Sequence, residues 1–183
     1  MSELQTQFRT KMVPALMKEL SLTNALAAPR VVKVVLNAGV GKAQTDKTVI
    51  DNVTSTFQRI SGQQPIQTKA KKSISNFKIR QGMVVGIKVT LRGKRMYDFL
   101  EKLVKITLPS MRDFHGLETN KGFDGHGNYL LGIREHIFFP EIRSDEVEKL
   151  HGLEVVINTS AKTDQECLAL LRSLGFPFKK LKV

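Results

Sequence analysis

The stretch at residues 84–92, VVGIKVTLR, alternates apolar and polar side chains over most of its length. Its apolar positions are Ile87, Val89 and Leu91. Its polar positions are Lys88, Thr90 and Arg92. Because successive side chains of a strand point to opposite faces, this spacing predicts a strand with one face in the core and one face outside it.

A second stretch, VVKVVLNA at residues 31–38, shows the same division and is followed by Gly39 and Gly41. Here Val32, Val34 and Leu36 share the predicted inner face. Lys33 and Asn37 share the outer one. The two strands together predict a polar platform, with Gln63, Gln64 and Gln67 near it in sequence.

The chemistry of this platform favours RNA. A sheet face wetted only by solvent is also polar, but these platform residues include no acid. Asparagine and threonine can hydrogen-bond to ribose, phosphate and base edges, as a shape-reading RNA site requires. Neither strand has an aromatic residue on this side, so we expect contact with a folded RNA backbone and its grooves rather than with stacked single strands.

Helices and strands alternate around a predicted sheet of about five strands. Hydrophobic spacing and turn residues predict helices over 4–20, from about 45 to Gly62, over 95–107 with a stop at Pro109, and from Thr163 to Gly175. They predict strands at 31–38, 63–68, 84–92, 129–138 and 154–160. The residues alone leave open whether neighbouring strands run parallel or antiparallel.

Several side chains are expected inside. For the second helix these are Val49, Val53, Phe57 and Ile60, and for the third they are Met96, Phe99, Leu100, Leu103 and Ile106. Residues 69–83 read as a long exposed basic loop with apolar anchors at Ile74, Phe77 and Ile79. Residues 114–128 hold four glycines, which predicts a mobile loop.

Positive charge is concentrated in one part of the chain. The protein has 29 lysines and arginines against 17 acids, a net charge of +12. Residues 52–97 carry ten of the basic residues and no aspartate or glutamate. Such segregation is typical of nucleic-acid-binding proteins, since phosphate neutralisation releases counterions; a solvated basic surface is the alternative.

Length and composition indicate one folded domain, residues 1–183, with no membrane partner. A chain of 183 residues, 41% hydrophobic and 25% charged, can bury one proper core. No apolar run reaches the length of a bilayer-spanning helix, and the N-terminus lacks a secretion signal, so we expect a cytosolic protein. The single Cys167 lies among leucines and reads as a small core residue.

No pattern for catalysis or a metal is found. Gly39 and Gly41 follow a strand, but their spacing does not match a phosphate-binding loop. The four histidines, His115, His126, His136 and His151, lack metal-ligand spacing. We therefore expect neither an enzyme nor a cofactor.

Five motifs carry a resemblance that covers nearly the whole chain. They are VVKVVLNAGVGK at 31–42, QPIQTKAKKSISNFKIRQG at 64–82, VGIKVTLRG at 85–93, GFDGHGNYLLGIREHIFFPEI at 122–142 and LRSLGFPF at 171–178. With them the chain resembles the family of large-subunit ribosomal proteins that binds 5S rRNA, in its bacterial branch.

The resemblance implies an α+β fold, a mainly antiparallel sheet with helices on one face and an open face that grips 5S rRNA in the central protuberance. Positions matching the family's RNA contacts are Asn37, Gln63 and Thr90, with Lys33 and Arg92 beside them. We also expect Lys88 to bind rRNA, because alternation places it on the same polar platform. The loop at 69–83 corresponds to the family's extended loop, which reaches toward peptidyl-site tRNA. Its matching residues are Lys69, Lys71, Lys72, Ser73, Ser75, Asn76, Lys78 and Arg80.

The implied partners are 5S rRNA, large-subunit rRNA, peptidyl-site tRNA, other 5S-rRNA-binding ribosomal proteins and a head protein of the small subunit. Residues 133–153 resemble the part of the family that meets this head protein in a bridge between subunits. The alternative is a generic basic RNA-binding or assembly factor without specificity for 5S rRNA. Such a factor would bind 5S rRNA and unrelated helices equally at matched salt.

Overall fold

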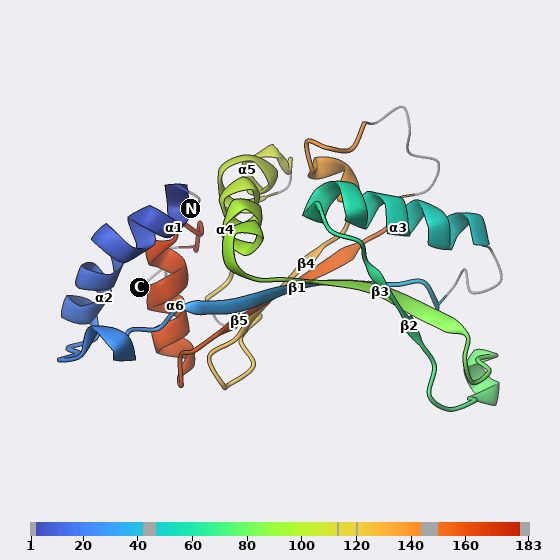
Figure 1. The fold of residues 1–183 in the computed structure, drawn as a ribbon, viewed down its shortest axis with the longest axis horizontal. Helices are drawn as coiled ribbons and strands as arrows, with labels where there is room; N and C mark the ends of the chain where they lie inside the picture. Colours follow the sequence, from blue (N-terminus) through green and yellow to red (C-terminus); the bar gives the residue numbers. More distant parts are fainter. Residues whose placement is uncertain (1–2, 42–46, 113, 120, 144–149, 180–183) are drawn as a thin grey trace. The chain divides into compact units, whose positions relative to one another are not determined.

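A computed structural model shows a five-stranded open antiparallel sheet (Figure 1). It describes residues 3–41, 47–112, 114–119, 121–143 and 150–179. The strand order is β2-β3-β1-β5-β4. The strands are β1 Val31–Gly39, β2 Ile66–Lys69, β3 Val84–Leu91, β4 Tyr129–Ile133 and β5 Leu153–Thr159. The sheet and its helices confirm the predicted α+β class.

Four helical segments accompany the sheet in the described parts of the chain. The first joins α1 Glu3–Gln7, a π-helical turn Phe8–Met12 and α2 Val13–Glu19. The second is α3 Lys47–Ser61. The third joins α4 Gly93–Lys102, a π-helical turn Leu103–Thr107 and α5 Leu108–Ser110, and the fourth is α6 Asp164–Ser173. The predicted cap of α3 at Thr45 or Asp46 lies outside the described residues.

The third helix does not stop at Pro109, as the sequence predicted, but passes through it to Ser110. Proline lacks the N–H that a helix interior needs, and its ring clashes with the carbonyl four residues earlier. A π-helical turn ends two residues before Pro109, and another ends two residues before Pro14. We infer that the wider π turn accommodates the proline ring in both helices.

The chain divides into two compact units, and four strands contribute residues to both. The first unit comprises residues 1–34, 91–131 and 156–183, and the second comprises 35–90 and 132–155. The single domain expected from sequence stays a prediction.

The core of the first unit contains side chains of the first and third helices. Leu4, Phe8 and Leu16 are buried, and the Phe8 ring lies 6.2 Å from that of Tyr97 on α4. From the third helix, Met96, Phe99, Leu100 and Leu103 are buried as predicted. Two predictions are wrong here: Ile106 is 47% exposed, because Thr107 and Leu108 take the inner positions after the π turn, and Val32 is 42% exposed while Val31 is buried. Cys167 is fully buried and free, which confirms its place in the core.

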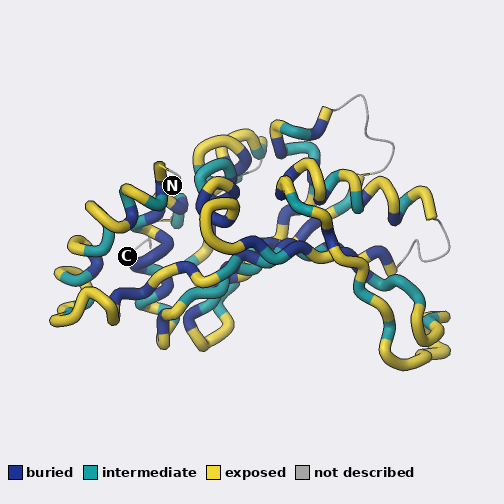
Figure 2. The backbone as a smooth tube through the Cα atoms, in the orientation of Figure 1, coloured by how far each residue is buried: buried dark blue, intermediate teal, exposed yellow. Residues whose placement is uncertain are grey.

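In the second unit, α3 covers one face of the sheet (Figures 1 and 2). The inner side of α3 consists of Ile50, Val53, Phe57 and Ile60, all buried; Val49 is only half-buried. The buried hydrophobic residues of the sheet in this unit are Leu36, Ala38, Ile87, Val89, Ile133, Leu153 and Val155. This face matches the inner face that alternation predicted for the two main strands.

Two predicted strands are shorter than expected. The strand at 129–138 ends at Ile133, and a 3-10 turn at His136–Phe138 replaces its second half. There the backbone N–H of His136 donates to the carbonyl of His151 at 3.2 Å, and Phe139 bonds back to His136. The strand at 63–68 begins only at Ile66, after Pro65, which cannot donate to the ladder.

Candidate nucleic-acid interface

The side of the sheet opposite α3 in the second unit is here called the open face. It follows from strand alternation and from the β2–β3 register, in which Ile66 lies opposite Lys88 and Thr68 opposite Gly86. Its members are Val35, Asn37 and Gly39, Ile66 and Thr68, Gly86, Lys88 and Thr90, Gly132 and Glu154, with Arg134 and Gly152 directly beyond the ends of β4 and β5. Ile66 is 63% exposed, so the face is mainly polar but not wholly so.

Four residues predicted to bind RNA lie in the second unit. Lys88 is exposed, and Asn37, Gln63 and Thr90 are half-buried. The Gln63 side-chain nitrogen donates to the Thr90 carbonyl at 3.3 Å, which ties the entry of β2 to β3. The other two belong to the first unit, where Lys33 is half-buried and Arg92 is exposed beside the start of α4. The RNA contacts of all six stay predictions.

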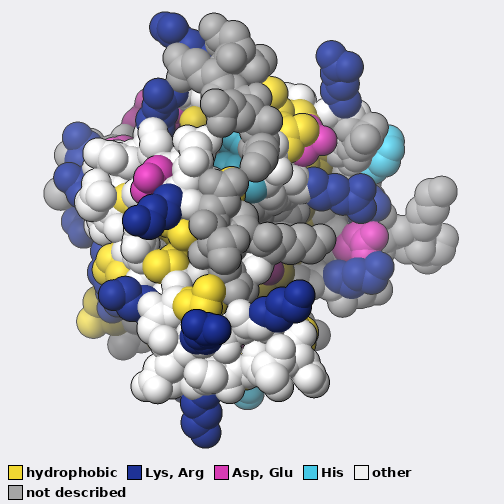
Figure 3. All heavy atoms as spheres, turned by 90° about the vertical axis from the view of Figure 1, so that its right-hand side faces the viewer, with side chains coloured by type: hydrophobic (Ala, Val, Ile, Leu, Met, Phe, Trp, Pro, Cys, Tyr) yellow, Lys and Arg dark blue, Asp and Glu magenta, His cyan; other side chains and the backbone are white. Residues whose placement is uncertain are grey.

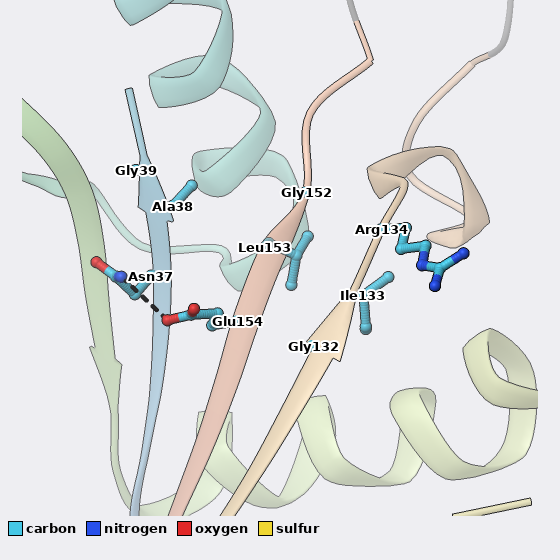
Figure 4. Close-up of a pocket in the computed structure, with 9 residues that line it drawn as sticks. All are labelled: Asn37, Ala38, Gly39, Gly132, Ile133, Arg134, Gly152, Leu153 and Glu154. Atoms are coloured by element: carbon cyan, nitrogen blue, oxygen red, sulfur yellow. Dashed lines mark hydrogen bonds between the residues drawn. The ribbon is translucent and has the colours of Figure 1, made fainter. Parts of the chain in front are cut away.

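One acidic residue on the open face was missed. The Asn37 side-chain nitrogen donates to a Glu154 carboxylate oxygen at 3.4 Å (Figure 4). The expectation of a platform without acids is therefore wrong. Alternation could have found Glu154, since Leu153 and Val155 on either side of it are buried.

Several basic side chains of the second unit have no acidic partner among the residues that the structure describes. Among the described residues, no acid forms an ion pair with Lys88 or Arg134, or with the basic residues of the loop at 69–83. Lysine and arginine side chains are spread over the face drawn in Figure 3. An uncompensated cation at a surface attracts a polyanion more strongly than one already paired within the protein.

The open face contains a hollow of about 380 Å³ (Figure 4). It spans three neighbouring strands of the second unit, β1, β5 and β4. Its lining residues are Asn37, Ala38, Gly39, Gly132, Ile133, Arg134, Gly152, Leu153 and Glu154. Ala38, Ile133 and Leu153 alternate with residues of the open face and are buried, so backbone and three glycines form most of its floor.

The loop at 69–83 extends the β2–β3 pair beyond the sheet (Figure 1). Its two sides are joined by Ala70 N–H to the Met83 carbonyl at 2.8 Å and by mutual bonds between Ile74 and Ile79 at 2.9 and 3.1 Å. Lys78 adopts the left-handed conformation after a 3-10 turn at Ser75–Phe77. The loop thus has a defined backbone made by its own hydrogen bonds.

Every residue predicted to contact tRNA is exposed in this loop. They are Lys69, Lys71, Lys72, Ser73, Ser75, Asn76, Lys78 and Arg80. Two of the predicted apolar anchors are wrong: Phe77 is 69% exposed and Ile74 is 45% exposed, because the loop has no core beneath it. Ile79 is half-buried. The tRNA contacts stay predictions.

The segment predicted to meet a small-subunit protein contains a pair of stacked histidines. The rings of His136 and His151 lie 3.9 Å apart at 20°. His136 is 3% exposed, and its burial lowers the pKa of the imidazole below its usual value. Residues 144–149 of this segment lie outside the described part of the chain.

Other site chemistry is not found in the residues that the structure describes. No three His, Cys, Asp or Glu side chains there come close enough together to bind a metal ion. Burial raises the pKa of the Cys167 thiol to about 12, which disfavours a reactive thiolate. None of the helices described is both long and apolar enough to span a bilayer.

Comparison with known proteins matches nearly the whole chain. A family model described as Ribosomal protein L5 matches residues 24–80, and the model for the C-terminus of the same ribosomal family matches residues 84–178. The chain is 53% identical over 180 residues to "Large ribosomal subunit protein uL5" of Halothermothrix orenii, covering 98% of this chain and 100% of that protein. Proteins of the same name from Idiomarina loihiensis and Oenococcus oeni are 50% and 52% identical, with 98% and 97% of this chain covered and 100% and 98% of theirs.

Proposed function

This chain belongs to the ribosomal protein L5 family, and from that membership and the open face we propose that it anchors 5S rRNA in the large ribosomal subunit. Membership makes the chain a structural, non-enzymatic constituent of the large subunit that binds rRNA in translation, in the cytoplasmic ribosomes of a bacterium.

The observation that carries the proposal is the open face with its unpaired cations. One side of the sheet is buried under α3, while Lys88 and Arg134 on the other side lack acidic partners among the described residues. Phosphate neutralisation by such cations supplies affinity, and the side chains of Asn37 and Thr90 supply hydrogen bonds to ribose or bases. No cofactor is needed for this kind of binding.

The basic loop gives the proposal a second contact. Its five lysines and arginines are exposed and make no ion pair with any acid that the structure describes. The hydrogen bonds across the loop hold these charges beyond the sheet. We propose that this loop touches tRNA in the peptidyl site, while the open face retains the 5S rRNA.

The remaining contacts proposed are protein–protein contacts. We propose that residues 133–153 contribute to a bridge with a head protein of the small subunit, and that other 5S-rRNA-binding proteins join the same complex. Pro140 and Arg143, which follow the 3-10 turn at His136–Phe138, are exposed and offer surface for such a bridge. We also propose that residues 1–183 act as one RNA-binding domain.

The direct experiment measures 5S rRNA binding at fixed salt with Asn37→Ala and Thr90→Ala. Each substitution removes a polar group from the open face, so we expect a loss of about 1 to 3 kcal/mol if that group is buried against RNA. Gln58→Ala is the matched control, because Gln58 is an exposed amide on α3 of the same unit. Wild-type affinity in both open-face variants would refute the platform.

Specificity is tested separately with an unrelated RNA helix at the same salt concentration. A 5S rRNA platform should bind its own RNA more tightly by orders of magnitude, roughly 10³-fold or more. Equal affinity for both RNAs would favour the generic basic factor.

A further inference from the structure

Three glycines, Gly39, Gly132 and Gly152, keep the hollow of the open face free of side chains. None of them adopts a positive φ, so backbone conformation does not require glycine there. A Cβ added at Gly39 or Gly132 would meet no heavy atom within 4 Å, so internal packing does not require it either. Glycine weakens a strand and often marks the close approach of a ligand or another backbone.

Glu154 stands at the edge of this hollow beside Asn37. In the described parts of the chain no lysine or arginine pairs with it. On a face that binds phosphates, an unpaired carboxylate repels the ligand and weakens binding. The position of Glu154 is explained if its carboxylate accepts hydrogen bonds from the RNA. In the sugar–phosphate backbone only the ribose hydroxyls can donate such bonds, so the bases are the other source of donors.

Among the four bases, guanine offers the best match to a carboxylate. Its Watson–Crick edge presents two adjacent donors, the ring N–H and the amino group, which fit the two oxygens of one carboxylate. Adenine and cytosine present one amino group beside an acceptor, and uracil presents one N–H between two acceptors. The edge is occupied by cytosine in a duplex, so the guanine must be unpaired to be read in this way.

We propose that the hollow binds one unpaired guanine of the ribosomal RNA, with the Glu154 carboxylate accepting both donors of its Watson–Crick edge. This inference rests on the proposed function and adds a base-specific subsite to it. Asn37 orients the carboxylate through its side-chain nitrogen, and Arg134 on the far side of the hollow contacts a neighbouring phosphate. A single base read by its edge needs no aromatic stacking platform, and the open face has none.

The direction in which one substitution changes RNA affinity distinguishes guanine binding by Glu154 from simple repulsion of phosphate. We expect Glu154→Gln to weaken 5S rRNA binding about tenfold at fixed salt, since a bidentate pair is lost. If Glu154 only repels phosphate, the same variant binds more tightly, and that result overturns the proposal. Asp51→Asn removes the same charge from the exposed side of α3, and we expect it to bind as well as wild type or slightly better.

The base is identified by replacing each unpaired guanine of 5S rRNA, one at a time, with inosine, which lacks the amino group. At one position we expect wild-type binding to fall several-fold, and Glu154→Gln binding to change far less. Preference for 5S rRNA without any position coupled to Glu154 overturns this inference alone. Equal binding of 5S rRNA and an unrelated helix overturns the proposed function and this inference together.

A second variant tests the hollow without touching the carboxylate. Gly132→Val adds a branched side chain where the Cβ meets open space, so the fold should tolerate it. We expect about tenfold weaker RNA binding with an unchanged or raised midpoint of thermal unfolding. Wild-type binding by this variant would show that nothing enters the hollow.

Discussion

The loop at 69–83 and the Gly-rich loop at 114–128 look alike in sequence, both polar and without regular periodicity, but their contacts differ. The first is held mainly by bonds within itself, such as Ala70 to Met83 and Gln81 to Ser73. The second is bonded to other parts of the first unit, with Leu117 accepting from Lys179 and donating to Pro177.

The Gly-rich loop is also closed by a polar network. One oxygen of Asp124 accepts from the backbone N–H groups of His126 and Asn128, and the other accepts from the Asn128 side chain. Asn128 in turn accepts from the backbone of Thr159 on β5 at 3.1 Å, and Gly127 donates to Asp164 at the start of α6. The mobility that glycine content predicts is therefore not expected where these contacts fix the backbone.

The comparison teaches that two loops of similar composition serve different ends. In the loop at 69–83 the charges are exposed and unpaired, so substitutions there should change binding. In the Gly-rich loop, Gly127 and Asn128 are bonded to other parts of the unit and Asp124 fixes the loop's own backbone, so substitutions at these positions should change stability.

The largest effect is expected from Gly127→Ala. Gly127 has a φ of +77°, and an added Cβ would lie 2.6 Å from the carbonyl oxygen of Ala161. We expect the free energy of unfolding, measured in urea, to fall by about 3 kcal/mol or more, because alanine would suffer both the strain of a left-handed backbone and a clash with the Ala161 carbonyl. Gly125→Ala is the matched control, with a φ of +81° and no atom within 4 Å, and should cost only about 1 kcal/mol. Equal losses would mean that the packing against Ala161 contributes nothing.

A phenylalanine in each loop provides the next comparison. The Phe123 ring lies 4.8 Å from that of Tyr129 and 6.3 Å from that of Phe178, whereas Phe77 is 69% exposed. We expect Phe123→Ala to lower the free energy of unfolding by about 2 kcal/mol, less than a fully buried ring. Phe77→Ala should change it by no more than about 0.5 kcal/mol. A large loss for Phe77→Ala would restore it as an anchor of its loop.

Asp124 makes the stability of the Gly-rich loop depend on pH. Its hydrogen bonds from Asn128, and more weakly from His126, hold the pKa of the carboxyl below its usual value. A lowered pKa in the folded state means that the charged form stabilises the fold above the usual range of aspartate, near 4, and that this stability is lost as pH falls through the lowered pKa.

We therefore expect Asp124→Ala to cost about 1 kcal/mol at neutral pH, in view of its exposed position. The difference from wild type should shrink as urea unfolding is repeated at lower pH. A difference that stays constant down to about pH 2 would mean that the carboxylate is not the source of the effect.

The parts of the fold that short-range periodicity determines were predictable from sequence. Alternation correctly placed Leu36 and Ile87 inside and Lys88 outside. Helical spacing correctly placed Phe57 on the buried side of α3. The last helix begins at Thr163 as predicted: the Thr163 hydroxyl accepts from the backbone N–H of Glu166 at 3.3 Å, and the Glu166 carboxylate accepts from the backbone N–H of Lys162 at 2.8 Å.

The wrong predictions concern features that depend on contacts between residues far apart in sequence or on local changes in helix geometry. The third helix continues through Pro109 because a π-helical turn precedes the proline. Val32 is exposed, although Val34 and Leu36, at the same alternate positions of the strand, are buried. The hollow could not be predicted, since it depends on the order β1-β5-β4, which sets Gly39, Gly152 and Gly132 on adjacent strands far apart in sequence. The position of Glu154 on the open face, by contrast, could have been predicted from strand alternation.

The smallest effect on stability, and the sharpest on binding, is expected from replacing Lys71, Lys72 and Arg80 together with alanine. All three are exposed and unpaired among the described residues, so the free energy of unfolding should change by no more than about 0.5 kcal/mol. The loop meets tRNA and not 5S rRNA in the proposed function, so 5S rRNA affinity should be retained and tRNA retention in assembled ribosomes should fall.

Salt dependence makes the result quantitative. Each lost phosphate contact lowers the slope of log affinity against log salt by about 0.7 to 0.9, so the triple variant should lose about 2 in slope for tRNA. Arg9, Lys11 and Lys18, exposed on the first helix, provide a control triple with the same loss of charge. If the control triple weakens tRNA retention equally, net charge explains the effect. If the loop variant instead releases 5S rRNA, the division of labour between the loop and the open face is wrong.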